Sequence, residues 1–193
     1  MNDSISRPFQ PFFNFSASIA HYRNGFAILL LTASMYLFDL DSDYFILSYV
    51  LVFAGETLRL WAAGYLHKGK ISTGGPFGFV RNPTYWGSVL IAIGLCAIAG
   101  SAWIWLLALV YFTVVYLPSI QYEEAILRKK FPVEFEAYSA RVPAFYPTLR
   151  RFHDPGISYS RKQIFRNKEH VAILAILLLY AYVILIAIRV VVP

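Results

Sequence analysis

The apolar residues of this chain come in long blocks separated by short polar stretches, and they do not alternate singly with polar residues. The blocks cover residues 25–38, 44–66, 84–99, 102–117 and 171–188. An upright helix crosses a bilayer with about 20 apolar residues, so the second block has ample length and the shorter ones need their flanks. This pattern predicts an all-α integral membrane protein with about five transmembrane helices.

Two of these blocks, 84–99 and 102–117, are separated only by Gly100 and Ser101. So short a connection predicts a tight antiparallel helical hairpin. Aromatic residues near the block ends are suited to the membrane interface: Tyr85, Trp86, Trp103, Trp105 and Tyr116. Residues 1–21 mix aromatic with polar residues and lack a signal-peptide pattern, which predicts an interfacial arm.

Composition supports a lipid environment. Hydrophobic residues make up 58% of the 193 residues and charged residues 15%, against roughly 45–50% and 25% in soluble domains. The mean hydropathy is +0.54.

The net charge of +6 is explained by topology. With the amino terminus inside, the outer turns hold no Lys or Arg, whereas the loop before residue 84 and the region 118–170 hold most of them. The positive-inside rule then places both segments in the cytoplasm and removes most of the case for a nucleic-acid partner. We expect the cell membrane of a prokaryote, or the endoplasmic reticulum if the chain is eukaryotic.

A polar, glycine-rich loop at residues 73–87 interrupts the apolar blocks. Its Gly-Gly-Pro turn at 74–76 lets the backbone approach a ligand closely. Asn82 and Pro83 predict a helix start, with Asn as N-cap and Pro at the first helical position. The exposed N–H groups of such a start, together with Arg81, would hold a carboxylate or phosphate. The alternative is an ordinary connection with Arg81 on lipid headgroups.

A pair of glutamates follows the fourth block. Pro118 is expected to kink the helix, and the residues after it continue with helical spacing. One helical stripe carries Ile120, Leu127 and Phe131. At least one carboxylate of Glu123 and Glu124 faces that apolar side and needs a cation or hydrogen-bond donors. The alternative is a salt bridge to Arg128 or Lys129 within the same helix.

Two further features could contribute to a site. The stretch 138–147 ends a short helix begun at Pro132 and continues as an extended, proline-punctuated segment. Glu56 and Arg59 lie three residues apart in the second block and can touch on one helix face. At that depth they are either a structural pair or the lining of a cavity.

The remaining reactive residue types do not form a recognisable site. The four histidines lack metal-ligand spacing, and no Ser or Cys has an obvious base beside it. A metal centre or an acyl-enzyme mechanism is therefore not expected.

Taken together, the motifs closely resemble the isoprenylcysteine carboxyl methyltransferase family and its phospholipid methyltransferase relatives. The resemblance rests on Gly75-Pro76-Phe77, Arg81-Asn82-Pro83-x-Tyr85-x-Gly87, Glu123-Glu124, Phe131 with Tyr138, and Arg141-Val142-Pro143. Their order and spacing match from about residue 67 to 150. The usual Arg-His-Pro of the family is Arg-Asn-Pro here. The size and the five apparent spans look like the minimal prokaryotic members.

The resemblance implies one membrane methyltransferase domain over residues 1–193. The arm and the first two spans occupy 1–66, the catalytic region 67–150, and a linker with the last span 151–193. It also implies S-adenosylmethionine as cofactor, held by cytoplasmic segments. The expected cofactor-binding residues are Gly75, Pro76, Phe77, Arg81, Asn82, Tyr85, Glu123, Glu124, Tyr138, Arg141 and Pro143.

The chemistry of the cofactor agrees with these residues. Its carboxylate suits Arg81 and a helix amino end, and its ammonium suits Glu123 or Glu124. Its sulfonium suits the aromatic faces of Phe77 and Tyr85. No dinucleotide-binding glycine fingerprint is present in the sequence, so the site would differ from those of soluble methyltransferases.

The acceptor is expected to be lipophilic and to enter from the bilayer. A carboxylate acceptor, as in the isoprenylcysteine enzymes, would need a positioning arginine, for which Arg141 and Arg59 are candidates. An amine or thiol acceptor must lose a proton, for which Glu123 or Glu124 is a candidate. We therefore assign catalytic roles to Glu124, Arg141 and Arg59. Membrane lipids are the other expected partner.

Two other functions are compatible with the sequence. The carboxy-terminal region of membrane sterol reductases is similar, and those enzymes bind a reduced nicotinamide dinucleotide. The chain lacks the additional spans expected of full-length members of that group. A non-enzymatic membrane assembly factor is the third possibility, favoured only if neither cofactor binds.

Overall fold

A computed structural model of the chain describes residues 44–67, 69–150, 152, 157–167 and 169–191. This part of the chain is helical and contains no strand. Its elements are α2 (Phe45–Tyr65), the 3₁₀ turn η1 (Gly75–Gly78), α3 (Pro83–Ala99), α4 (Ala102–Tyr111), the π-helical turn η2 (Phe112–Tyr116), α5 (Leu117–Lys130), α6 (Pro132–Ser139), α7 (Arg161–Arg166) and α8 (Glu169–Val191). The predicted arm at 1–21 and the predicted span at 25–38 lie outside the described residues.

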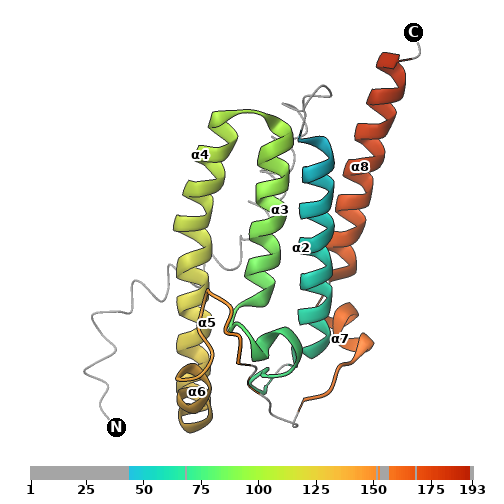
Figure 1. The fold of residues 1–193 in the computed structure, drawn as a ribbon. Helices are drawn as coiled ribbons and strands as arrows, with labels where there is room; N and C mark the ends of the chain where they lie inside the picture. The colour runs from blue at the N-terminus through green and yellow to red at the C-terminus, as the bar shows by residue number, and fades with distance from the viewer. Residues whose placement is uncertain (1–43, 68, 151, 153–156, 168, 192–193) are drawn as a thin grey trace.

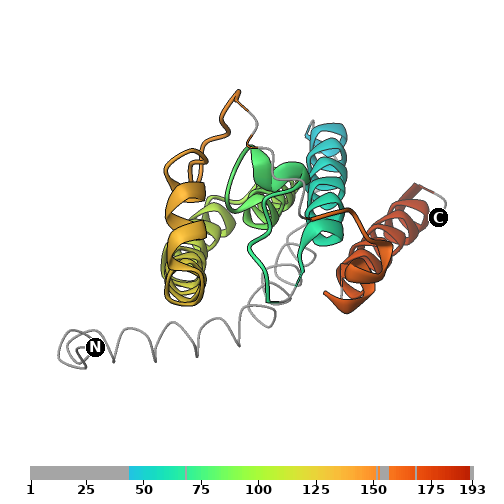
Figure 2. The same cartoon turned by 90° about the horizontal axis from the view of Figure 1, so that it is seen from below.

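The long helices stand side by side, and the short elements gather at one end (Figure 1). Seen from that end, α2 lies between α3 and α8, and α5 and α6 lie beyond α3 (Figure 2). The end that carries η1, α6 and α7 brings together the two polar segments for which the sequence predicts the same side of the membrane.

Two of the described helices are long and apolar enough to cross a membrane: Phe45–Tyr65 and the continuous helix Ala102–Lys130. The helix Pro83–Ala99 and the searched part of α8, Glu169–Tyr182, are apolar but shorter. Large apolar side chains are exposed on the outer faces of these helices, as expected of surfaces in contact with lipid: Ile46, Phe53, Trp103, Leu109, Leu174 and Leu185. The prediction of an all-α membrane protein is supported, and the count of five spans stays a prediction.

The predicted hairpin is confirmed. Gly100 ends α3 with a φ of 60°, the left-handed conformation that glycine adopts at low cost, and α4 begins two residues later. Inside the turn, Cys96 and Ala99 of α3 pack against Ile104 of α4. The small residues of the connection therefore set the antiparallel packing of the two helices.

The chain stays helical after the fourth block, as the spacing of the residues after Pro118 predicts. The helix continues without interruption through Pro118 to Lys130. Proline has no N–H to donate four residues back, and its ring crowds the carbonyl at that position. The π-helical turn Phe112–Tyr116 ends two residues before Pro118 and contains Val114, whose carbonyl would accept the missing α-helical hydrogen bond.

Glycines allow α2 and α3 to approach each other closely. A Cβ atom on Gly55 would lie 2.5 Å from the backbone oxygen of Gly87, and a Cβ on Gly87 would lie 2.6 Å from the backbone oxygen of Gly55 and from Cγ of Arg59. Such distances are shorter than van der Waals contact. The crossing therefore depends on the absence of side chains at both positions.

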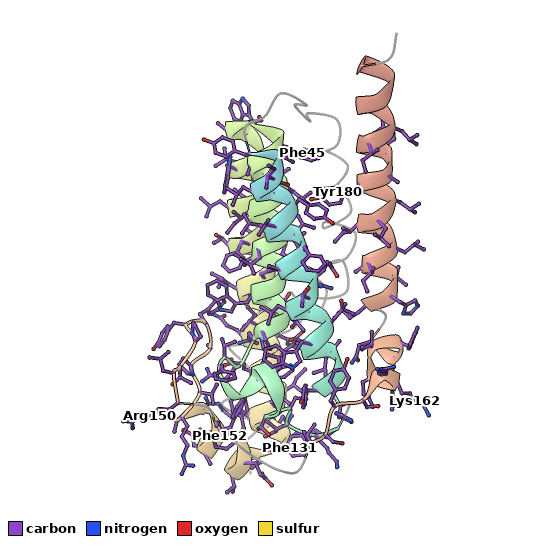
Figure 3. The ribbon with its side chains drawn as sticks, turned by 45° about the vertical axis from the view of Figure 1, so that its right-hand side comes forward. Phe45, Phe131, Arg150, Phe152, Lys162 and Tyr180 are labelled. Carbon is purple, nitrogen blue, oxygen red and sulfur yellow. The ribbon has the colours of Figure 1, made fainter. Side chains whose placement is uncertain are left out.

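The carboxy-terminal helices α7 and α8 contact α2 near both of its ends. Tyr180 of α8, labelled in Figure 3, packs edge-on against Tyr49 of α2, with ring centroids 5.5 Å apart. At the opposite end, the amide nitrogen of Asn167, which follows α7, donates to the carbonyl oxygens of Ala63 and Leu66. These carbonyls belong to the end of α2, where helical partners run out.

Candidate active site

The glycine-rich loop forms a tight turn that is packed by an aromatic ring. Gly75 has a φ of 56° and begins η1. Cβ atoms on Gly74 and Gly75 would lie 2.7 and 2.4 Å from the ring of Tyr65, which itself packs edge-on against Tyr159 at 5.6 Å. The group that lies close to the backbone of Gly74 and Gly75 here is therefore the ring of Tyr65.

Arg81, just before α3, forms a two-pronged ion pair with Glu124 of α5. Its Nε and Nη2 each lie 3.0 Å from one carboxylate oxygen of Glu124. Both side chains are largely buried, at 15% and 20% exposed. The planar guanidinium matches the carboxylate in both position and charge, which makes this the strongest kind of protein ion pair.

The same guanidinium also binds the segment after α6. Nη1 of Arg81 donates to the backbone oxygens of Ser139 and Val142 at 3.1 and 2.9 Å. The backbone nitrogen of Arg81 donates to the oxygen of Pro143 at 2.9 Å. Arg81 therefore joins the glycine-rich loop to α5 and to the segment that follows α6.

Asn82 occupies the first position before α3 but does not cap the helix with its side chain. Its amide nitrogen donates to Glu124 Oε1 at 3.0 Å and to the backbone oxygen of Ala144 at 3.2 Å. The predicted side-chain cap is wrong, because the amide group bonds to a distant carboxylate in preference to its own helix. Pro83 is the first helical residue, as predicted.

Glu123 faces α3. Its Oε1 accepts a hydrogen bond of 2.9 Å from the hydroxyl of Tyr85. Arg128, one of the partners considered within the same helix, bonds instead to Glu136 of α6 at 3.2 Å. The two neighbouring glutamates are thus both turned toward the start of α3.

An aromatic cluster lies beside this carboxylate. Tyr85 packs edge-on against Tyr116 of the π-helical turn, with centroids 5.1 Å apart. Phe112, from the same turn, packs against Phe145 at 6.0 Å, and the indole nitrogen of Trp86 donates to the backbone oxygen of Phe145. The sequence motifs did not indicate Tyr116 or Phe112 as neighbours of the site, whereas Phe145 lies in the predicted stretch 138–147.

The segment after α6 runs along the loop through backbone hydrogen bonds. Thr148 and Phe152 donate from their backbone nitrogens to the oxygens of Phe79 and Gly78, each at 2.9 Å. Phe152 lies at the same end of the molecule as Phe131 (Figure 3). The residues that follow the predicted stretch 138–147 therefore lie along the end of η1.

Tyr138 of α6 is fully enclosed in this region. Its hydroxyl donates to the backbone oxygen of Phe77 at 2.7 Å, and the residue is 3% exposed. Burial raises the pKa of the Tyr138 phenol; nearby Arg81 opposes this shift and nearby Glu124 adds to it. The phenol therefore stays protonated and keeps donating its hydrogen bond.

We expect Tyr138→Phe to lower stability by about 1–2 kcal/mol, because the buried oxygen of Phe77 loses its donor. The folded pKa lies above the unfolded value of 10.0. The contribution is therefore full below pH 10 and declines as the pH rises from there toward the higher folded pKa. Thermal unfolding of both proteins at pH 8 and at about pH 11 measures the difference, which should shrink at the higher pH. Tyr146→Phe, at an exposed residue, should change neither value.

The other two residues expected near the chemistry lie apart from this network. Arg141 is exposed, and its guanidinium lies 5.7 Å from the ring centroid of Phe152. Arg59, on α2, bonds to Glu169 of α8 and to Ser88 of α3. The structure brings Arg81, Asn82, Tyr85, Glu123 and Glu124 together with Phe77, Tyr138 and Pro143. Arg59 lies on another helix face, and the backbone of Arg141 bonds to Tyr138 while its guanidinium lies over Phe152.

Glu169 and Ser88 are partners of Arg59 that no sequence motif indicates. Glu169 is the first residue of α8, where an acidic side chain is common simply because the helix dipole favours it. Nothing in the local pattern points from it to Arg59, which lies 110 positions away. Among the described residues, no group of three or more His, Cys, Asp or Glu side chains could hold a metal ion.

Residues 44–134 match the family model for phospholipid methyltransferase. This region is similar to the phospholipid methyltransferase family. The resemblance expected from the motifs is thereby confirmed for this region. The phospholipid methyltransferase region runs from α2 into α6 and contains Arg81, Asn82, Tyr85, Glu123 and Glu124.

A similar protein is the nickel-cobalt-cadmium resistance protein NccN of Alcaligenes xylosoxydans xylosoxydans, 34% identical over 97 residues. The match covers 49% of this chain and 45% of NccN, so the chain spans about half the length of that relative. No solved structure matches the chain.

Proposed function

We propose that the protein transfers a methyl group from S-adenosylmethionine to a lipophilic acceptor that resides in the membrane. The observation that carries the proposal is the network of Arg81, Asn82, Tyr85 and the two glutamates at one end of apolar helices. All of its members lie inside the phospholipid methyltransferase region.

The ion pair between Arg81 and Glu124 changes the roles expected for these two residues. The sequence-based hypothesis assigned Arg81 to the carboxylate of the cofactor and a glutamate to its ammonium. In the structure the guanidinium and the Glu124 carboxylate neutralise each other. We therefore assign both to positioning, since together they hold α3, α5 and the segment after α6 in place.

Other groups in the same region fit the charges of the cofactor. The ammonium suits Glu123, which Tyr85 already orients through its hydroxyl. The carboxylate suits the amino end of α3, which carries partial positive charge and has no side-chain cap. The edges and faces of Tyr85 and Tyr116 offer an aromatic surface for the sulfonium.

When bound, the cofactor supplies a methyl group already activated on sulfur. The protein then has to align the acceptor, place charges and exclude water. The aromatic cluster around Tyr116 suits the exclusion of water, because Tyr85, Val115, Tyr116 and Ile120 are all buried. An acceptor with its chain in the bilayer would approach the site from the membrane side of this cluster.

The proposal places the site at the cytoplasmic face. Exposed basic side chains occupy the end of the molecule that carries the network: Arg128, Lys129, Lys130, Arg150, Arg161, Lys162 and Arg166. Arg150 and Lys162 mark this end in Figure 3. The positive-inside rule supports the cytoplasmic assignment.

The test is transfer of labelled methyl from S-adenosylmethionine to a panel of prenylcysteines, amino lipids and lipophilic thiols. The full-length protein in lipid nanodiscs should label at least one class, and mass spectrometry of the product identifies it. Absence of transfer to all three classes, with the protein folded, would contradict the proposal. Tyr146→Phe, outside the network, serves as the active control.

A further inference from the structure

A second polar cluster lies on the membrane helices, where α2, α3 and α8 meet. Arg59 is its centre. Nε and Nη2 of Arg59 donate to Glu169 Oε2 at 3.2 and 2.8 Å, and Nη1 donates to the hydroxyl of Ser88 at 2.5 Å. Glu56 lies on the same face of α2, with Oε1 3.8 Å from Nε of Arg59.

The guanidinium is shared unequally between the two carboxylates. Glu169 receives two hydrogen bonds from Arg59, whereas Glu56 is held only by the longer ion-pair contact. Glu56 is 9% exposed, and its Oε2 is buried without a hydrogen-bond partner. Among the carboxylates in the described part of the chain, this is the buried oxygen that lacks a partner.

A buried, unpartnered carboxylate oxygen is costly in an apolar surrounding and calls for a donor. Two carboxylates with one guanidinium leave one negative charge uncompensated when both are ionised. A group that is both cationic and rich in N–H donors satisfies the charge and the missing hydrogen bond at once. A carboxylate ligand would satisfy neither and would be repelled.

We propose that the cluster of Glu56, Arg59 and Glu169 binds the ammonium head of a lipophilic ligand, with Glu56 Oε2 as its acceptor. The proposal rests on the proposed function in one respect, since it identifies this ligand with the methyl acceptor. Glu56 lies nine residues before the end of α2, about 13 Å along the helix. An alkyl chain can therefore stay among the apolar helices while its head reaches the cluster.

The cluster lies on the membrane side of the network around Arg81. Gly87, over which Arg59 packs, is one turn into α3, and α3 begins directly after Asn82. Ser88 is likewise in α3, three residues after Tyr85. The ammonium site and the proposed cofactor site are therefore joined by the first turns of one helix.

The experiment uses the full-length protein in lipid nanodiscs without S-adenosylmethionine. The probe is a dodecylammonium that carries a photoreactive diazirine, and labelled peptides are mapped by mass spectrometry. We expect saturable labelling of peptides from α2 and α8 that unlabelled dodecylammonium competes away and dodecanoate does not. Glu56→Gln should weaken the apparent affinity by about tenfold or more, as the loss of a charged hydrogen bond implies. Glu136→Gln, an exposed glutamate on α6, should match the wild type.

Labelling that is equal in Glu56→Gln and wild type, or equal competition by dodecanoate, would overturn the proposal. If Glu56→Gln does not fold, competition on the wild-type protein alone tests the proposal: dodecylammonium should compete with the probe and dodecanoate should not. Because no cofactor is present, the outcome is independent of methyl transfer. Glu56-dependent binding without any transfer would count against the proposed function only, and transfer without ammonium binding would count against this site only.

Discussion

Arg81→Ala is expected to lower the free energy of unfolding by about 3 kcal/mol, the lower end of the cost of breaking a buried ion pair from one side, because both partners are partly exposed. The substitution leaves Glu124 largely buried without its cation and removes donors from the backbone oxygens of Ser139 and Val142. Binding of S-adenosylmethionine should be lost as well, because α3, α5 and the segment after α6 are no longer held together. Chemical unfolding and calorimetric titration measure the two effects.

Arg128→Ala is the matched control. Arg128 also forms an ion pair with a glutamate, Glu136, but the two side chains are 59% and 67% exposed. An exposed pair of this kind contributes roughly 0–1 kcal/mol. Equal destabilisation by Arg81→Ala and Arg128→Ala would contradict the assignment of Arg81 as the central positioning residue.

Gly87→Ala is expected to destabilise the protein by about 1–3 kcal/mol, in the range of an overpacked core. The new Cβ would lie 2.6 Å from the backbone oxygen of Gly55, and a backbone atom cannot move aside as a side chain can. Helices α2 and α3 would have to separate. The higher helix propensity of alanine offsets only about 1 kcal/mol.

The separation should also disturb the contacts that Arg59 makes across the crossing, so methyl transfer should fall together with stability. Thermal unfolding and an activity assay on the same preparation measure both. Ala54→Leu is the control, because Ala54 precedes Gly55 but is exposed on the outer face of α2. A Gly87→Ala protein as stable and active as Ala54→Leu would show that the close crossing is not required.

The helices were predictable because their signal is local. Residues 44–66 were expected as one apolar helix and form Phe45–Tyr65, and the two-residue hairpin turn is where the sequence placed it. The helix also continues past residue 117, as the helical spacing after Pro118 predicts, although hydropathy falls there. Polarity marks where a helix leaves an apolar environment, and it does not mark where the helix ends.

The residues of the network were predictable from the sequence, but the partners with which each forms hydrogen bonds and ion pairs were not. Motif order indicated Arg81, Asn82 and both glutamates, but helix rules offered Arg128 or Lys129 as partners. The partner found for Glu124 is Arg81, 43 positions away. Asn82 likewise bonds to a distant carboxylate, where local rules predict a cap. Tertiary packing decides such choices, and a single sequence does not contain that information in local form.

The pair of Glu56 and Arg59 shows the same limit. Their spacing predicted a contact on one helix face, and the structure has that contact at 3.8 Å. The shorter contact of Arg59 is with Glu169, which no spacing rule connects to α2. That third residue turns a balanced pair into a cluster with a spare carboxylate oxygen.

The most direct measurement is the thermal unfolding of the wild-type protein in nanodiscs. The Tm with S-adenosylmethionine is compared with the Tm with reduced nicotinamide adenine dinucleotide phosphate. A ligand at about one hundred times its Kd stabilises the folded state by about 2.7 kcal/mol. We predict a saturable rise in Tm with S-adenosylmethionine that Arg81→Ala abolishes, and no rise with the dinucleotide. A rise in Tm with the dinucleotide alone would contradict a methyltransferase built on this network. The absence of a rise in Tm with either compound would contradict it as well.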